Sequence, residues 1–363
     1  MRWMATPLSI VALSRAAAMV VVWMCVRPGV RPGNLFASWD GGWYTDLALH
    51  GYGPRPVGGP IFHSLQHLAF LPGAPYLARA VSEVTPLGVI EAGVVVSILC
   101  TCAAGVLLWR LLEPRFGADT ASIALALLVF SPHAFVLSMF YTDAPMLLSV
   151  VLTFHWLHRR QWAAAGAAAF IGGLIRPNAF VLVIPCVIEA VQARRRGEAA
   201  GWRPFVAAVV APLGFVAWLV YSARRTGSLL GYFDMQDAGW GSRIDGGGST
   251  LEALGRLVTG SSLDATEAVS SIVFIVLGLG GLVLAWRARV PLSWFAYAAA
   301  TVLLVFVNAR QTSGPRFLIT AFPLFVGWAS VLPSRVRPAL VGASAVVMAG
   351  LGFLAYTTNT YTP

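Results

Sequence analysis

The sequence contains no lysine, and only 11% of its 363 residues are charged, whereas 58% are hydrophobic. Soluble domains carry about 25% charged residues, so the polar residues here are too few to cover the surface of a soluble enzyme. The same balance excludes a disordered chain, and four cysteines are too few for a disulfide-rich secreted scaffold. A mean hydropathy of +0.74, with 13 Trp and 20 Phe, is typical of a polytopic membrane protein.

Several common motifs are missing from the sequence. It has no phosphate-binding glycine loop, dinucleotide fingerprint, Gly-x-Ser-x-Gly elbow or zinc motif. This argues against a cytosolic nucleotide sugar as substrate and favours a lipid-linked donor that reaches the outer leaflet. The net charge of +10 comes from arginines that lie mostly between apolar stretches, so we predict no nucleic-acid partner. The four cysteines fall in or beside apolar segments, and we interpret them as core residues.

Apolar stretches of the length needed to cross a bilayer, roughly 20 helical residues, recur along the whole chain. We predict one all-α integral membrane domain over residues 1–363, with about eleven transmembrane helices. The two stretches between 162 and 193 are short and split at Arg176-Pro177, so they form a re-entrant or a tilted pair. The predicted spans lie near 7–25, 88–109, 119–139, 143–157, 162–176, 178–193, 203–223, 266–286, 291–308, 316–333 and 337–357.

The arginines also predict an orientation. With a cytoplasmic N-terminus, the short inner loops and the N-terminus hold about 13 Arg in about 36 residues, against about 11 in about 124 outside. The two long loops, 26–87 and 224–265, then lie outside. We therefore predict a multi-pass protein of the cell membrane whose active site is extracytoplasmic.

The first long loop opens with a motif of aromatic residues around Asp40. Trp39 precedes it, Trp43 and Tyr44 follow at helical spacing, and Gly51 is a typical helix stop. This pattern predicts a short helix that lies in the membrane interface. Two interpretations of Asp40 stay open at this stage: an N-cap that binds free backbone N–H groups, or a catalytic base.

The same loop continues with His63 and His67, followed by an amphipathic stretch that predicts a second interfacial helix after Pro75. Two histidines four residues apart can share a metal ion on one helix face. Nearby prolines and the lack of a third ligand argue against this, so we predict no metal site and no cofactor; a divalent cation is not indicated. His67 is the better candidate for a hydrogen bond to a substrate phosphate.

The stretch from Phe130 to Asp143 forms an outer turn between two predicted spans. Asp143 either caps the helix that follows, with Pro145 in the first turn, or shares a cavity with Asp40. In the second case its carboxylate positions the acceptor. Tyr141, two residues earlier, is a candidate substrate-binding residue.

Two arginines interrupt or adjoin apolar stretches on the outer side, Arg176 and Arg316. Charges at such depths mark a site or an ion pair, and a guanidinium fork suits a phosphate group. Anchoring to lipid headgroups is the alternative. Arg310, in the last outer loop, is also a candidate substrate-binding residue.

In their order along the chain, these motifs resemble the GPI second-mannose transferase (PIG-V-like) family of the GT-C membrane glycosyltransferases. Asp143 stands where that family has Glu, and Leu71 where it has Phe. Absence of Lys is typical of GC-rich genomes, so we expect a bacterial member. The matching stretches are Trp39-Asp40 with Trp43-Tyr44, Gly51-Tyr52, His67 to Pro75, Phe140 to Asp143, Arg176-Pro-Asn, Gln236 with Trp240, and Pro315-Arg316-Phe with Phe322-Pro-Leu-Phe.

The resemblance implies a GT-C-like helical bundle and inverting transfer of mannose from a polyprenyl- or dolichyl-phosphate donor to a hydroxyl of a lipid or glycan acceptor. Asp40 would be the base, and Asp143 an acceptor-positioning carboxylate or second base. Arg176, Arg316 and His67 would contact the phosphate. The remaining substrate-binding candidates are Trp39, Trp43, Tyr44, Tyr141, Gln236, Trp240 and Arg310.

Two other functions are compatible with a polytopic chain. A transporter or lipid flippase needs ionisable residues near mid-membrane and related halves. Here Arg15, Glu91 and Glu189 lie toward span ends, and the sequence shows no internal repeat. An inactive scaffold that binds a partner through its outer loops is the third alternative.

Overall fold

The computed structural model describes residues 2–28, 32–53, 65–198, 201–358 and 361. These residues form helices joined by turns, and their β pairing is confined to one isolated bridge between Ile244 and Asn308. The predicted all-α class is therefore confirmed.

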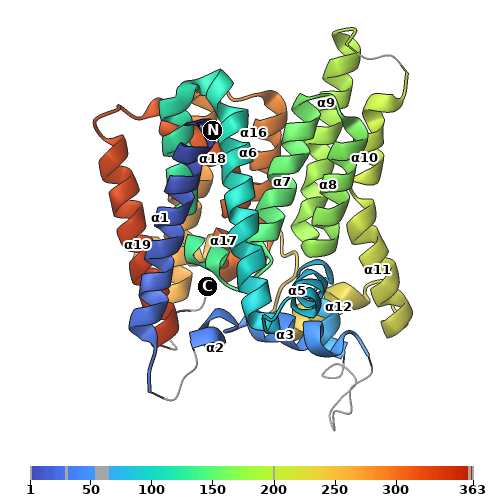
Figure 1. Cartoon of the computed structure of the whole chain (residues 1–363), viewed down its shortest axis with the longest axis vertical. Helices are drawn as coiled ribbons and strands as arrows, with labels where there is room; N and C mark the ends of the chain where they lie inside the picture. The colour runs from blue at the N-terminus through green and yellow to red at the C-terminus, as the bar shows by residue number, and fades with distance from the viewer. Residues whose placement is uncertain (1, 29–31, 54–64, 199–200, 359–360, 362–363) are drawn as a thin grey trace.

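The first half of the chain supplies helices that run between the two ends of the molecule and short ones that lie across the lower end (Figure 1). They are α1 (Arg2–Cys25), α2 (Pro32–Phe36), α3 (Asp40–His50), η1 (Gln66–Ala69), α5 (Gly73–Val84), α6 (Val89–Val129), η2 (Ala134–Ser138), α7 (Asp143–His158), α8 (Trp162–Ile175), η3 (Pro177–Leu182) and α9 (Val183–Arg195).

The second half of the chain supplies the remaining helices, and the last of them, α19, packs against α1 (Figure 1). Its elements are η4 (Arg203–Phe205), α10 (Val206–Val210), α11 (Leu213–Thr226), α12 (Gly231–Trp240), α13 (Gly248–Thr259), α14 (Ala265–Val273), η5 (Phe274–Gly280), α15 (Gly281–Arg287), α16 (Leu292–Val307), η6 (Gln311–Ser313), α17 (Gly314–Thr320), α18 (Phe322–Val331) and α19 (Arg337–Thr357).

Six helices of the described residues are long and apolar enough to cross a membrane, or seven if the bent pair α17–α18 counts as one span. The chain is thus a multi-pass membrane protein, but the predicted count of eleven spans is not confirmed. α6 contains two helices that meet at Gly117, whose φ of 80° is not helical, and this break lies in the gap between the predicted spans 88–109 and 119–139. One reason for the lower count is that α8 and α16 have only 14 and 16 residues.

The apolar stretch that contains α17 and α18 is bent. The two helices meet at 73° around Ala321, and Pro323, which lacks an N–H to continue the α17 ladder, opens α18. Because of this break, the predicted span 316–333 is not one straight helix. Its first arm, α17, carries Arg316.

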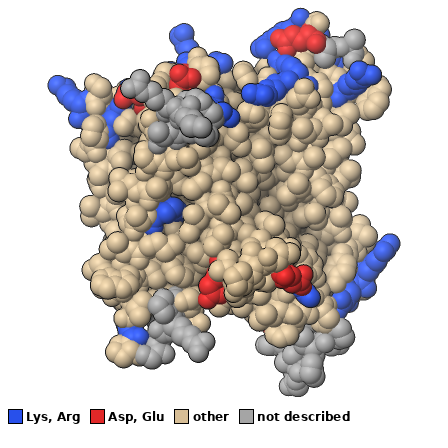
Figure 2. All heavy atoms as spheres, viewed as in Figure 1, with Lys and Arg blue, Asp and Glu red and all other residues tan. Residues whose placement is uncertain are grey.

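The helices predicted in the first long loop are present as α3 and α5, which pack against each other. As expected, α3 ends at Gly51, whose φ of 66° lets its N–H bond the carbonyl of Leu47. With α2 and α12 they lie across the lower end of the long helices (Figure 1). The arginines visible in Figure 2 gather mostly at the opposite, upper edge.

Three apolar clusters hold this arrangement, one of them between η5, α16, α17 and α18. The largest lies between α1, α6, α7, α18 and α19; it contains Cys186, and Cys100 and Cys102 pack against it. The second fixes α3 and η1 on α11 through Tyr44, Leu47, Leu68 and Trp218. Burying each such side chain contributes about 2 kcal/mol, so the lower helices are anchored and can position a site. Cys25 is also buried, whereas Cys100 and Cys102 are half-buried.

Candidate active site

Asp40 begins α3 and faces an arginine from the far end of the sequence. Its Oδ2 accepts a hydrogen bond of 2.8 Å from Nη1 of Arg316, 276 residues away in the chain. The N-cap position belongs to Trp39, which has φ of 52° and makes no side-chain cap bond. Asp40 therefore does not act as the N-cap that was one of its two interpretations.

Arg316 is held on several sides. Its side chain is only 6% exposed, its guanidinium lies 5.3 Å from the ring centroid of Tyr141, and Nη2 contacts Oγ of Ser313 at 3.5 Å. The Tyr141 hydroxyl in turn donates to the carbonyl of Ser38 at 3.2 Å. A cation over an aromatic face is stabilised, so Tyr141 supports Arg316 from behind.

Asp143 forms a second pair with Arg176, at the start of α7. Its Oδ1 accepts a bond of 2.5 Å from Nη1 of Arg176, and the carboxylate is fully buried. The second oxygen, Oδ2, has no hydrogen-bond partner among the described residues. Arg176 ends α8 and lies 4.8 Å over the ring of Phe317. Pro145 occupies the first turn of α7, as the sequence predicts.

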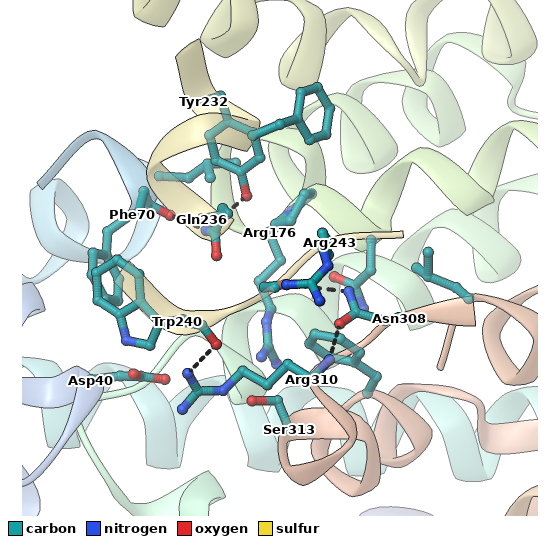
Figure 3. Close-up of a pocket in the computed structure, with 18 of the residues that line it drawn as sticks. Asp40, Phe70, Arg176, Tyr232, Gln236, Trp240, Arg243, Asn308, Arg310 and Ser313 are labelled. Carbon is teal, nitrogen blue, oxygen red and sulfur yellow. Dashed lines mark hydrogen bonds between the residues drawn. The ribbon is translucent and has the colours of Figure 1, made fainter. Parts of the chain in front are cut away.

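A cavity of about 780 Å³ opens beside these pairs, between the lower helices and the ends of α8 and α16 (Figure 3). Both long loops supply its walls, the first through α3 and the Phe70 region and the second through α12 and Arg243. The predicted site residues that line it are Trp39, Asp40, Trp43, Tyr44, Arg176, Gln236, Trp240, Arg310 and Arg316.

Three predicted residues do not line this cavity. Asp143 and Tyr141 are buried behind it and contact the arginines instead. His67 is buried with its ring 5.8 Å from that of Tyr52, away from the phosphate-binding position expected for it. His63, the other half of the metal pair considered in the sequence, lies outside the described residues.

The second long loop is fastened to the cavity by contacts with distant segments. Gln236 donates to the carbonyl of Ala69 at 2.7 Å and to the Tyr232 hydroxyl at 3.1 Å. Nη1 of Arg310 donates to the carbonyl of Trp240 at 2.8 Å. Burial lowers the pKa of Arg310, an effect that the nearby Asp40 carboxylate opposes. These contacts explain why the loop holds one position over the site.

Charge and aromatic side chains give the cavity its character. Arg176, Arg243, Arg310 and Arg316 line the cavity together with Asp40, Asp234 and Asp237, so guanidinium donors for an anion are available there. The indole of Trp43 stacks on Phe70 at 5.4 Å, and Trp240 meets Phe70 edge-on at 5.1 Å. Burial raises the pKa of the Tyr44 hydroxyl, which therefore stays protonated.

Sequence reasoning missed several lining residues, among them Arg243, Asn308 and Ser313. They come together because the Ile244–Asn308 bridge joins two loops, with the N–H of Ala309 donating to the carbonyl of Arg243 at 2.8 Å. A three-residue pairing has no periodicity in the sequence. The only available signal was the position of Arg243 in the second long outer loop. Among the described residues, no group of three or more His, Cys, Asp or Glu side chains could hold a metal ion.

Comparison with known proteins places this architecture. Residues 69–221, fewer than half of the chain, match the dolichyl-phosphate-mannose-protein mannosyltransferase family model. ArnT from Cupriavidus metallidurans bound to undecaprenyl phosphate aligns with a TM-score of 0.55 at 19% identity, over 95% of this chain and 64% of ArnT. The chain has a GT-C, ArnT-like fold. It spans less than two thirds of the length of ArnT.

Two further solved structures align with this chain. ArnT without ligand gives a TM-score of 0.57, with the same identity and coverage. An oligosaccharyltransferase from Archaeoglobus fulgidus aligns at 12% identity over 98% of this chain and 56% of its own, with a TM-score of 0.47. No curated protein matches the chain by sequence. None of these comparisons separates the predicted PIG-V-like family from other GT-C proteins.

Proposed function

We propose that this protein is a membrane glycosyltransferase that moves mannose, with inversion, from a polyprenyl-phosphate donor to an acceptor hydroxyl on the extracytoplasmic side. One observation carries the proposal: the carboxylate of Asp40 and the guanidinium groups of Arg176, Arg310 and Arg316 line one cavity. A base and an anion-binding group within one enclosure are what transfer from a sugar phosphate requires.

Two observations support a lipid-linked donor. Part of the cavity wall is formed by exposed apolar side chains, Phe180, Phe233 and Ile244, which suit a polyprenyl chain better than a water-soluble nucleotide. The ArnT of similar fold was solved with undecaprenyl phosphate bound. The description of the family matched by residues 69–221 supports mannose as the sugar.

The chemistry follows from the positions of these groups. The acceptor oxygen attacks the anomeric carbon on the face opposite the phosphate, and Asp40 takes the hydroxyl proton as the new C–O bond forms. The bond from the anomeric carbon to the phosphate oxygen breaks, and its electron pair leaves on the phosphate. The sugar passes through an oxocarbenium-like state, and Arg316 and Arg310 stabilise the charge gathered by the phosphate.

Arg316 has the free donors for this role. A guanidinium carries five N–H groups; Nη1 bonds Asp40, Nη2 lies 3.5 Å from Ser313, and Nε has no hydrogen-bond partner in the described structure. Nε is buried, so an incoming phosphate oxygen would bond to the remaining N–H groups of Nη1 and Nη2, which leaves the ion pair intact. The pair thus brings the base and a phosphate-binding group into the same cavity.

The distribution of arginine supports the proposed orientation. The lower end, with α3, α5 and α12, carries the cavity, whereas the arginines visible in Figure 2 gather mostly at the upper edge. Inner loops of membrane proteins are enriched in Arg. The upper end is then cytoplasmic, as is the N-terminus, and the site faces outward in the cell membrane.

The proposal is tested with Asp40→Asn in membranes supplied with radiolabelled polyprenyl-phosphate mannose. We expect the variant to fold and to bind undecaprenyl phosphate, while label transfer to envelope glycans or lipids falls about 1,000-fold or more. The matched control is Asp237→Asn, an aspartate of the same cavity whose side chain is 47% exposed.

Full transfer by Asp40→Asn would reject Asp40 as the base. If the wild type moved intact lipid or solute across the bilayer, and transferred no sugar from any polyprenyl donor, the transporter or flippase alternative would replace the enzyme. If a different sugar were transferred from the same carrier, only the proposed identity of the sugar as mannose would be wrong.

A further inference from the structure

A second, smaller cavity adjoins the first. Its volume is about 390 Å³, and Trp240 and Arg310 line both cavities. Figure 3 shows the Arg310 guanidinium bonded to Trp240, with the Asp40 carboxylate pointing toward it. The second cavity is lined by Trp240, Gly241, Ser249, Glu252, Ala253, Arg256, Glu267, Ala309, Arg310 and Thr312.

The linings of the two cavities differ in chemistry. The first has a large apolar wall, whereas the second has two carboxylates, Glu252 and Glu267, beside the hydroxyl-bearing Ser249 and Thr312. Arg256 lies between the carboxylates, with Nη1 3.5 Å from Glu267 and Nε 3.8 Å from Glu252. Its buried Nε has no hydrogen-bond partner.

We propose that the second cavity binds the terminal sugar of a glycan acceptor. This inference rests on the proposed function and specifies its acceptor. Carboxylates accept hydrogen bonds from ring hydroxyls, and a guanidinium donates hydrogen bonds to them. A lipid tail would remove Glu252, Arg256 and Glu267 from water and offer them no hydrogen bond in return.

The reaction geometry also favours two separate chambers. Inversion requires the acceptor oxygen and the phosphate to lie on opposite faces of the anomeric carbon. With the donor in the first cavity, a sugar in the second directs a hydroxyl past Trp240 and Arg310 toward Asp40. The attacking hydroxyl then loses its proton to Asp40, and the phosphate departs on the side of Arg316 and Arg176.

The test measures binding of methyl α-mannopyranoside to the full chain in nanodiscs by saturation-transfer NMR. Two variants change the site in different ways. The double variant Glu252→Gln/Glu267→Gln removes the charged hydrogen-bond acceptors, and Ser249→Phe fills the second cavity. We expect each to weaken binding about tenfold or more. Glu83→Gln on α5 is the matched control, because that carboxylate is 60% exposed and lies outside both cavities.

Undecaprenyl phosphate, a probe for the first cavity, is bound by the wild type and both variants if they fold; should one variant fail this check, the other decides. If the saturation-transfer signal were unchanged in both variants, or if undecaprenyl phosphate abolished it by competition, the sugar would bind elsewhere and the proposal would be wrong. The absence of hexoside binding by the wild type would also overturn the proposal. If the wild type transferred no sugar in the enzymatic test, but bound the hexoside and the variants weakened that binding, only the proposed function would be rejected.

Discussion

Asp40 and Asp143 each begin a helix, and each accepts a hydrogen bond from an arginine on a distant segment. The surroundings of the two pairs differ. The Asp40 side chain is 21% exposed and lines the large cavity, whereas that of Asp143 is fully buried behind it. A proton acceptor must meet its substrate, so in the proposed reaction only Asp40 is placed to take a proton from an acceptor hydroxyl. The second pair holds Arg176 in place.

Because of this difference in burial, the two ion pairs contribute differently to the free energy of unfolding. Removing one partner of a buried pair leaves an uncompensated charge and destabilises the fold. Around Asp40 the cavity admits water, so the same removal is better tolerated there. The comparison therefore predicts that substitutions at Asp143 affect mainly stability and those at Asp40 mainly turnover.

The largest expected stability effect is that of Asp143→Asn. The neutral amide keeps the shape but leaves Arg176 without its counter-ion over the Phe317 ring, so the free energy of unfolding should fall by about 3 kcal/mol. Thermal unfolding in nanodiscs measures this, with Asp40→Asn as the matched variant and a smaller shift. If Asp143→Asn kept wild-type stability and lost all transfer, Asp143 and not Asp40 would be the base, and the assignment of the two carboxylates would be wrong.

A smaller effect is expected from Arg316→Lys. Lysine keeps the charge and can pair with Asp40 but lacks the planar fork for a phosphate, so we expect the KM for the donor to rise about tenfold while kcat changes less. Steady-state kinetics over a range of donor concentrations separate the two. Arg79→Lys, an exposed arginine paired with Glu83 on α5, serves as the control. An unchanged KM would remove Arg316 from the phosphate contacts.

The sequence predicted the local parts of this site. Asp40 at a helix start, the stop at Gly51 and Arg176 at the end of an apolar stretch follow from short-range patterns. It did not predict which carboxylate meets which arginine, because the Asp40–Arg316 contact joins residues 276 positions apart. Hydropathy also could not show that the predicted span 316–333 is broken, since the bend at Ala321 changes helix direction without changing apolar composition.

The smallest effect concerns His133, in the turn that leads to Asp143. Burial, with a smaller contribution from Arg316, lowers the pKa of His133 to about 3, and its Nε2 contacts the Tyr361 hydroxyl. An unfolded histidine has a pKa of about 6.5, so as pH falls below that value the unfolded chain gains a proton that the folded chain refuses. Stability is therefore full above about pH 6.5 and declines toward pH 3.

Between pH 7.5 and 5.5 this linkage amounts to about 1 kcal/mol. Thermal unfolding midpoints across that range should fall less steeply for His133→Asn than for the wild type. His158→Asn, at the exposed far end of α7, should keep the wild-type slope because its ring is open to solvent in both states. Equal slopes for all three proteins would mean that water reaches the turn before Asp143. The conclusion that the Asp143–Arg176 pair is shielded from water, unlike the Asp40–Arg316 pair, would then be wrong.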